Sequence, residues 1–157
     1  MAHISSGVFM LKPSLRELRE CVGRPLLTEV EQTTAARELI DRGVAEMVVV
    51  SLGAEGALLV TARSSHRYAA IDVPSVSGVG AGDAMVAGIV VGLSRAWPVP
   101  VAVRYGIATA TAKLQTPGTS AFVRSDVDGY FDGYFDGVDT EGTVDAKGTA
   151  VRPVRSR

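Results

Sequence analysis

The stretch VGAGDAMVAGIVV, residues 79–91, joins a turn of small residues to an apolar run and predicts the start of a helix. The first N–H groups of a helix have no intrahelical acceptor and lie at the positive end of its dipole, so this turn can bind an anion such as phosphate. Asp83 is the unusual member, because a carboxylate repels phosphate and is therefore expected in an anion-binding turn only where it has a chemical role of its own. Accepting a proton from an attacking hydroxyl is such a role. An anion-binding turn that contains a proton acceptor therefore points to phosphoryl transfer to an alcohol.

Two common nucleotide-binding signatures do not fit this turn. The glycines Gly78, Gly80 and Gly82 have the wrong spacing for the Gly-x-Gly-x-x-Gly of a dinucleotide-binding fold. A P-loop needs Gly-Lys followed by Ser or Thr, whereas the one lysine beside a glycine is Lys147. The alternative interpretation is an ordinary helix start, where Gly and Asp are both usual.

Hydrophobic periodicity predicts alternating strands and helices around this stretch. The expected strands are about residues 8–11, 47–51, 57–61 and 66–71, and the expected helices are about residues 14–22, 28–42, 84–93 and 99–114. Capping boxes open the first two helices, Ser14 with Glu17 and Thr28 with Glu31. The run 47–51 is apolar almost throughout, as expected for a strand buried on both faces of a sheet. This order predicts an α/β layered domain.

The C-terminal tail differs in composition. Residues 128–131 (DGYF) recur as residues 132–135, a unit too short for a solenoid repeat. Glycine at every fourth position weakens a helix by up to ~1 kcal/mol each relative to alanine. From residue 138 onward acidic, Gly, Thr and finally Arg residues dominate without periodicity, which predicts disorder. We therefore divide the chain into residues 1–125 and a repeat with its tail, residues 126–157.

The composition is typical of a soluble intracellular protein. Hydrophobic residues make up 46% of the chain and the formal net charge is −1, which excludes the basic excess of a nucleic-acid binder. The single cysteine, Cys21, excludes an internal disulfide and a cysteine-based zinc site, and we expect it to be a small buried hydrophobe. The sequence has neither a signal-peptide pattern nor an apolar run of membrane-spanning length. We expect a cytoplasmic protein with no nucleic-acid or membrane partner.

Three motifs stand in a fixed order along the chain, LKPSLREL (residues 11–18), VVVSLGAEGA (residues 48–57) and GAGD (residues 80–83). Together they resemble the PfkB (ribokinase-like) family of carbohydrate kinases, and within it the phosphofructokinase and tagatose-phosphate kinase branch. The resemblance covers about residues 7–125 and corresponds to the C-terminal, ATP-binding half of the kinase domain. It implies a ribokinase-like, Rossmann-type layered sheet with flanking helices, truncated at the N-terminal side.

The resemblance implies ATP-dependent phosphoryl transfer to a hydroxyl of a sugar phosphate. Asp83 would be the general base that accepts the hydroxyl proton. The anion hole would consist of four consecutive backbone N–H groups, those of Gly80, Ala81, Gly82 and Asp83. Lys12 would reach the ATP phosphates as a point charge, although by itself it would be a surface lysine.

The resemblance also assigns the pair Ser14 and Glu17 to magnesium and phosphate binding. Glu17 matches the acid of the family's Asn-x-x-Glu motif, which organises the magnesium shell. Ser14 replaces the asparagine, and a hydroxyl is shorter and lacks the amide's NH₂ donors. The capping box alone would also explain this pair.

Further nucleotide contacts are implied on two segments. Ser51, Gly53 and Gly56 resemble the loop beside the nucleotide, where glycines admit the backbone close to ribose and phosphate. As a bare pattern this loop would be a turn between strands. Ile107 and Thr111, one helical turn apart, fall where the family lines its adenine pocket.

Two functions from different classes follow. The first is a phosphofructokinase-like kinase that uses ATP and Mg²⁺, with a sugar phosphate and a nucleotide as small-molecule partners. The second is a catalytically inactive nucleotide-binding or regulatory remnant that lacks the sugar site and the lid. In either case an exposed sheet edge with unpaired N–H and C=O groups predicts a homo-oligomer or another association through that edge.

Overall fold

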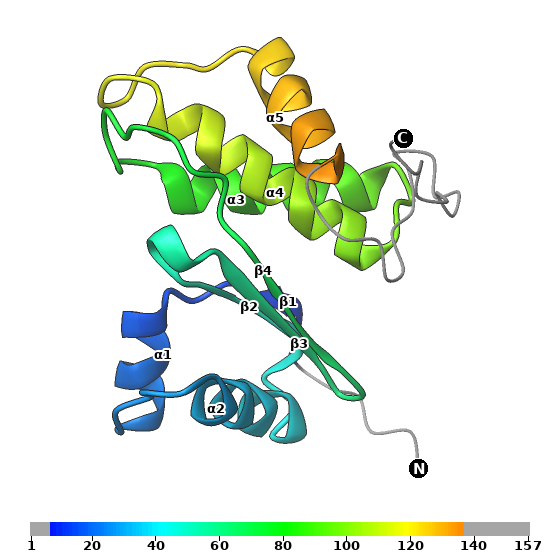
Figure 1. The fold of residues 1–157 in the computed structure, drawn as a ribbon. Helices are drawn as coiled ribbons and strands as arrows, with labels where there is room; N and C mark the ends of the chain where they lie inside the picture. Colours follow the sequence, from blue (N-terminus) through cyan, green and yellow to red (C-terminus); the bar gives the residue numbers. More distant parts are fainter. Residues whose placement is uncertain (1–6, 137–157) are drawn as a thin grey trace, which may run out of the picture. The chain divides into compact units, whose positions relative to one another are not determined.

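The computed structural model describes residues 7–136 and divides the chain into two compact units, residues 1–70 and residues 71–157. Within the described residues, the strands of the first unit are β1 (Val8–Leu11), β2 (Ala45–Ser51), β3 (Ala57–Thr61) and β4 (Ser65–Tyr68). Its helices are α1 (Leu15–Val22) and α2 (Glu29–Asp41), and a short 3-10 turn, η1 (Gly53–Glu55), joins β2 to β3. The second unit contains α3 (Ala81–Ser94), α4 (Val99–Leu114) and α5 (Arg124–Asp136). The predicted order of elements is confirmed, with α5 in addition (Figure 1).

The strands of the first unit form one sheet in the order β1-β2-β3-β4. β1 and β2 are parallel, and the two following pairs are antiparallel. Parallel neighbours need a crossover connection, which α1 and α2 supply on one face of the sheet (Figure 1). β4 ends at Tyr68, three residues before the predicted end, because its pairing with β3 stops there.

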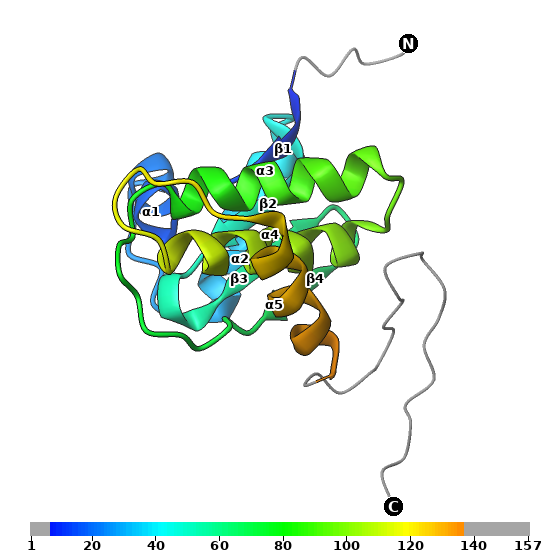
Figure 2. The same cartoon turned by 90° about the horizontal axis from the view of Figure 1, so that it is seen from above.

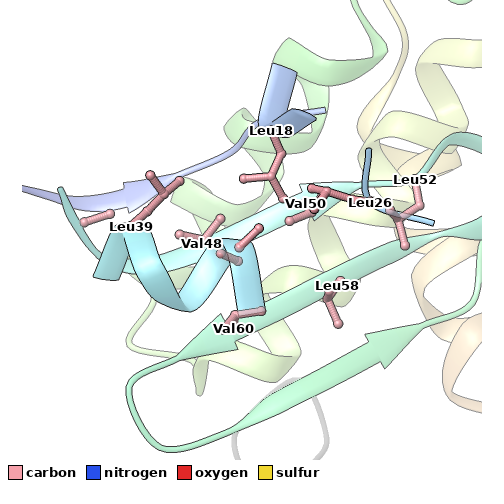
Figure 3. Packing of buried hydrophobic residues seen from close by; sticks show 11 residues of the cluster. Leu18, Leu26, Leu39, Val48, Val50, Leu52, Leu58 and Val60 are labelled. Carbon is pink, nitrogen blue, oxygen red and sulfur yellow. The ribbon is translucent and has the colours of Figure 1, made fainter. Parts of the chain in front are cut away.

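The core of the first unit lies between the sheet and its two helices. The side chains of Val48 and Val50 of β2 and Leu58 of β3 lie on the helix-covered face of the sheet. They belong to one buried cluster with Leu18 of α1 and Leu39 of α2 (Figure 3). The intervening β2 residues are buried as well, so burial on both faces of this strand is confirmed.

The ends of α1 and α2 follow the predicted capping chemistry. Both capping boxes are present, Ser14 with Glu17 and Thr28 with Glu31. The expectation for Cys21 is wrong, because its side chain is exposed. The apolar residues of α1 that pack on the core are Leu15, Leu18 and Val22. This spacing of three and four residues leaves Cys21 beside the buried stripe.

In the second unit, α3 and α4 pack very closely (Figure 2). A Cβ added at Gly106 of α4 would meet Ile89 and the Met85 carbonyl of α3, and one added at Gly92 would meet Ala102. Glycines therefore let the two backbones approach. None of the helices in residues 7–136 is long and apolar enough to cross a membrane.

Helix α5 contains the tandem repeat, so the division at residue 126 falls inside a helix. Val127, Phe131 and Tyr134 are buried at helical spacing, and the Phe131 ring stacks on Trp97 with centroids 5.7 Å apart. The repeat glycines have open space where a Cβ would be. Packing of one apolar face thus stabilises a helix that glycine alone would weaken. The tail predicted to be disordered, from residue 138, lies outside the described residues.

Candidate functional site

The first group of predicted site residues lies where the parallel strands β1 and β2 end. The ammonium of Lys12 donates to the hydroxyl of Ser51 at 3.3 Å. The Ser51 N–H donates to the Pro13 carbonyl at 2.9 Å, and Ser14 forms an isolated parallel bridge with Ser51. Open α/β sheets bind ligands outside the carboxyl ends of their parallel strands. The structure therefore brings Lys12, Ser14 and Ser51 together at the end of the sheet where a ligand is expected.

Glu17 and Ser14 are joined by the reciprocal bonds of the capping box. Glu17 Oε2 accepts from the Ser14 N–H at 2.6 Å, and Ser14 Oγ accepts from the Glu17 N–H at 3.2 Å. The backbone bond from Ser14, followed by its hydroxyl, lowers the pKa of Glu17 below its ordinary value. The exposed Glu17 side chain is therefore an ionised carboxylate at neutral pH.

A carboxylate in this state fits magnesium, which takes hard oxygen ligands. Among residues 7–136 no group of three or more His, Cys, Asp or Glu side chains could hold a metal ion. Magnesium at phosphoryl-transfer sites commonly uses one or two carboxylates together with substrate phosphates and water. One carboxylate from Glu17 is compatible with that donor set, and its metal role stays a prediction.

The loop after β2 is shaped by two glycines with positive φ. Gly53 has φ +60° and Gly56 has φ +94°, and the Leu52 N–H donates to the Gly56 carbonyl at 2.8 Å. A Cβ at Gly56 would overlap the Tyr68 carbonyl oxygen, so this position requires glycine. Gly53 is exposed and has open space beside its Cα, which leaves room for close approach of a ligand.

The second group surrounds the N-terminus of α3. Gly80 is the N-cap, with φ +78°, and its carbonyl accepts from the Ala84 N–H at 2.9 Å. The Ala81 N–H spans the turn to the Gly78 carbonyl at 3.3 Å. Within the described part of the chain, the other three amides of the predicted anion hole, at positions 80, 82 and 83, donate to no acceptor. Three of the four amides are thus available to a ligand.

Asp83 lies in the first turn of α3, and its side chain is exposed. Within residues 7–136 its carboxylate takes part in no hydrogen bond or ion pair, so it is not used as a side-chain cap of this helix. Free amides can bind the phosphoryl group that is transferred, and a carboxylate beside them can accept the proton of the hydroxyl that attacks this group. The local geometry is therefore compatible with the predicted base.

The residues predicted to line the adenine pocket lie on α4. Ile107 and Thr111 are both buried, and the Thr111 hydroxyl donates to the Ile107 carbonyl at 2.8 Å. This bond satisfies the hydroxyl inside its own helix. The contact of these two residues with adenine stays a prediction.

Sequence reasoning gave no role to Lys113, which lies in the last turn of α4. The residue is only 7% exposed, and its ammonium donates to the carbonyls of Gly118 at 2.8 Å and Ser120 at 2.7 Å. The signal in the sequence is a lysine near the end of an apolar helical run, four residues before Pro117-Gly118.

Comparisons with known proteins cover the same residues. Residues 1–126 match the family model described as pfkB family carbohydrate kinase. ATP-dependent 6-phosphofructokinase isozyme 2 of Mycobacterium tuberculosis (strain H37Rv) is 63% identical over 131 residues, which are 83% of this chain and 39% of that relative. Phosphofructokinase-2 from Escherichia coli, in a crystal structure with potassium, has a TM-score of 0.77 at 32% identity and is matched over 82% of this chain and 42% of its own. Ribokinase from Thermotoga maritima has a TM-score of 0.69 at 26% identity, over 78% of this chain and 42% of its own.

These matches confirm the resemblance found from the three motifs, and the solved structures confirm the ribokinase-like α/β fold. The chain spans about two fifths of the length of the curated relatives it matches. No site residue is tested by the comparisons, so each residue role stays a prediction.

Proposed function

Because the chain belongs to the pfkB family of carbohydrate kinases, we propose that it serves ATP-dependent phosphoryl transfer to a hydroxyl of a sugar phosphate. The observation that carries the proposal is the N-terminus of α3, where amides without an acceptor among the described residues adjoin the exposed carboxylate of Asp83. A transfer enzyme needs both an anion hole and a proton acceptor at one place. This turn would supply both within four residues.

The amides would act on the charge of the transferred group. The transition state of phosphoryl transfer is loose, with negative charge spread over the equatorial oxygens, so the protein contributes mainly position and neutralisation. N–H groups fixed by a helix need no reorientation during the reaction, which makes their stabilisation effective. The amides at positions 80, 82 and 83 would donate to those oxygens.

Asp83 would act on the acceptor. As the sugar oxygen forms its bond to the γ-phosphorus, the bond from that phosphorus to the β,γ-bridging oxygen breaks and ADP leaves with the electron pair. The hydroxyl proton passes to the Asp83 carboxylate and then to solvent. The Asp83 side chain is exposed, so solvent can take up this proton.

The first unit would contribute residues to nucleotide binding. Lys12 would donate to a phosphate, with Ser51 as its neighbour at 3.3 Å, and the glycines at 53 and 56 would allow the backbone to approach the ribose. Magnesium, when bound, neutralises phosphate charge, and Glu17 would hold it together with the phosphate oxygens. Ile107 and Thr111 would contact the adenine.

Calorimetry with ATP and Mg²⁺ on the purified chain tests the proposal. We expect binding with a Kd between about 1 µM and 1 mM, a range typical of enzyme substrates. Lys12→Met should weaken this binding by about tenfold or more, because a hydrogen bond to a charged group contributes roughly 1.5–3 kcal/mol. ADP release in the presence of hexose phosphates then measures transfer.

Arg16→Met is the matched control, since Arg16 is an exposed cation of the same unit that pairs with Glu20 at 3.0 Å. It removes the same charge and should leave the Kd within about twofold. Equal weakening by both variants would show general electrostatic attraction and count against a phosphate site at Lys12. ATP binding without transfer to any hexose phosphate would favour the nucleotide-binding, non-catalytic alternative.

We also propose that the chain associates with a second copy through β1. Among residues 7–136, β1 pairs with β2 only, so its outer N–H and C=O groups have no ladder partner. Val8 and Phe9 on this edge strand are 51% and 53% exposed. An apolar edge of this kind favours pairing with another strand, and a two-fold axis would make the two β1 strands antiparallel.

Sedimentation velocity tests the association. We expect a dimer or larger species whose population rises with concentration, and we expect Phe9→Lys to shift it to monomer, because a charged side chain disfavours edge pairing. The monomeric variant should still fold, since Phe9 is outside the core. A wild-type chain that stays monomeric at high concentration would overturn the proposal.

A further inference from the structure

The ammonium of Lys113 is enclosed by oxygen atoms of the loop that follows α4. It donates to the carbonyls of Gly118 and Ser120 at 2.8 and 2.7 Å and to the Thr116 hydroxyl at 3.2 Å. These three bonds use all three of its N–H donors. Within the described residues no carboxylate pairs with it, so its acceptors are neutral oxygens of residues 116–120.

The stem of Lys113 lies against the N-cap of α3. A Cβ added at Gly80 would be 3.1 Å from Lys113 Cε, so the side chain passes directly beside the glycine that begins the helix. The methylenes of a lysine can pack in this way while its ammonium bonds elsewhere. One side chain thus contacts both the loop 116–120 and the glycine-rich turn.

The end of α4 is also bonded to the chain that leads into this turn. The N–H groups of Val76 and Ser77 donate to the Leu114 carbonyl at 2.8 and 3.2 Å, and Gln115 donates to the Pro74 carbonyl. Residues 114 and 115 therefore bond to residues 74–77, which lead into the turn, while Lys113 bonds to the loop 116–120.

We propose that Lys113 is a positioning residue, whose ammonium anchors the loop 116–120 and thereby keeps the N-terminus of α3 in its anion-binding conformation. Lys113 needs no contact with nucleotide or sugar for this role. The proposal rests on the proposed function only in its statement that the turn binds an anion. Its conformational part applies to the chain without any ligand.

Amide hydrogen exchange on the full chain tests the conformational part. In Lys113→Met, which keeps the stem and removes the ammonium, we expect at least tenfold faster exchange at three amides: Val76 and Ser77, which donate to the Leu114 carbonyl, and Ala84, which donates to the Gly80 carbonyl. Exchange at Ser120 should accelerate as well. Lys12→Met, the same substitution in the first unit, should change none of these rates.

Chemical rescue separates positioning from a general loss of structure. Lys113→Ala removes the side chain beyond Cβ, which propylammonium replaces in length and charge. We expect propylammonium, and not propanol, to restore slow exchange at Ala84 and the ATP affinity measured by calorimetry. Failure of propylammonium to slow exchange at Ala84 would overturn the proposal, as would faster exchange confined to residues 116–120 in Lys113→Met.

The proposed function and the proposed role of Lys113 would be contradicted by different results. A wild-type chain that does not bind ATP contradicts the proposed function, whereas the exchange rates and their rescue still decide the conformational role of Lys113. If ATP binds equally well to wild type and Lys113→Met while exchange at Ala84 is faster, Lys113 does not position the anion hole and the proposal is overturned.

Discussion

Replacing Asp83 by asparagine is expected to lower the rate of phosphoryl transfer by about 10²- to 10⁴-fold, the usual contribution of a general base. Asparagine keeps the size of the side chain and cannot accept the hydroxyl proton. ATP affinity should stay within about tenfold of wild type or improve, because the change removes a negative charge beside the amides that bind phosphate. Loss of turnover with binding retained is the signature of an interaction made only in the transition state.

Initial rates of ADP formation with a hexose phosphate acceptor, measured beside calorimetric ATP binding, check this prediction. Asp132→Asn is the matched control, since Asp132 is exposed on α5 and has no role in the proposed chemistry. A wild-type rate in Asp83→Asn would remove this carboxylate from the mechanism. Parallel loss of ATP binding and turnover would show instead that Asp83 supports the helix start.

Local chemistry explains which elements could be predicted from the sequence. Each capping box is specified by two side chains three residues apart, so Ser14 with Glu17 and Thr28 with Glu31 predicted the starts of α1 and α2 correctly. The apolar run at 47–51 predicted β2, which begins two residues earlier. Each signal depends on neighbours in sequence, which are visible without the fold.

The features that were missed depend on tertiary contacts. Helix α5 forms over glycines at 129 and 133 because Phe131 stacks on Trp97, more than thirty residues earlier in the sequence. Lys113 was missed because two of its three acceptors are backbone carbonyls, whose positions no residue type reveals. Cys21 was assigned to the wrong side of a helix because only the packed structure shows how wide the buried stripe is.

The candidate site was predictable where it is built on motifs. The three motifs located Lys12, Ser51 and the turn at 80–83, and the structure places the first two 3.3 Å apart. Sequence alone could not show that the Ala81 N–H bonds to Gly78 while the Gly82 N–H has no acceptor within residues 7–136. Which amides are available depends on the φ and ψ angles of the turn, and those become visible only in the structure.

Replacing Gly106 by alanine is expected to lower the free energy of unfolding by roughly 1–3 kcal/mol, the usual cost of overpacking a close interface. The added Cβ would lie 2.5 Å from Ile89 Cγ1 and 2.8 Å from the Met85 carbonyl oxygen, so α3 and α4 would have to separate. Alanine is intrinsically the better helix former by up to ~1 kcal/mol, which makes the sign of the effect diagnostic.

Gly133→Ala provides the matched control for this last prediction. It is the same substitution within a helix, and nothing lies within 4 Å of the added Cβ, so the helix propensity should appear as a gain of up to ~1 kcal/mol. Urea unfolding of the two variants beside wild type measures both changes. The changes in the free energy of unfolding should have opposite signs, because contact between α3 and α4 determines the effect of Gly106→Ala and helix propensity alone determines the effect of Gly133→Ala. A Gly106→Ala variant as stable as Gly133→Ala would mean that α3 and α4 do not pack backbone to backbone, and the turn that begins α3 would then lose its support from α4.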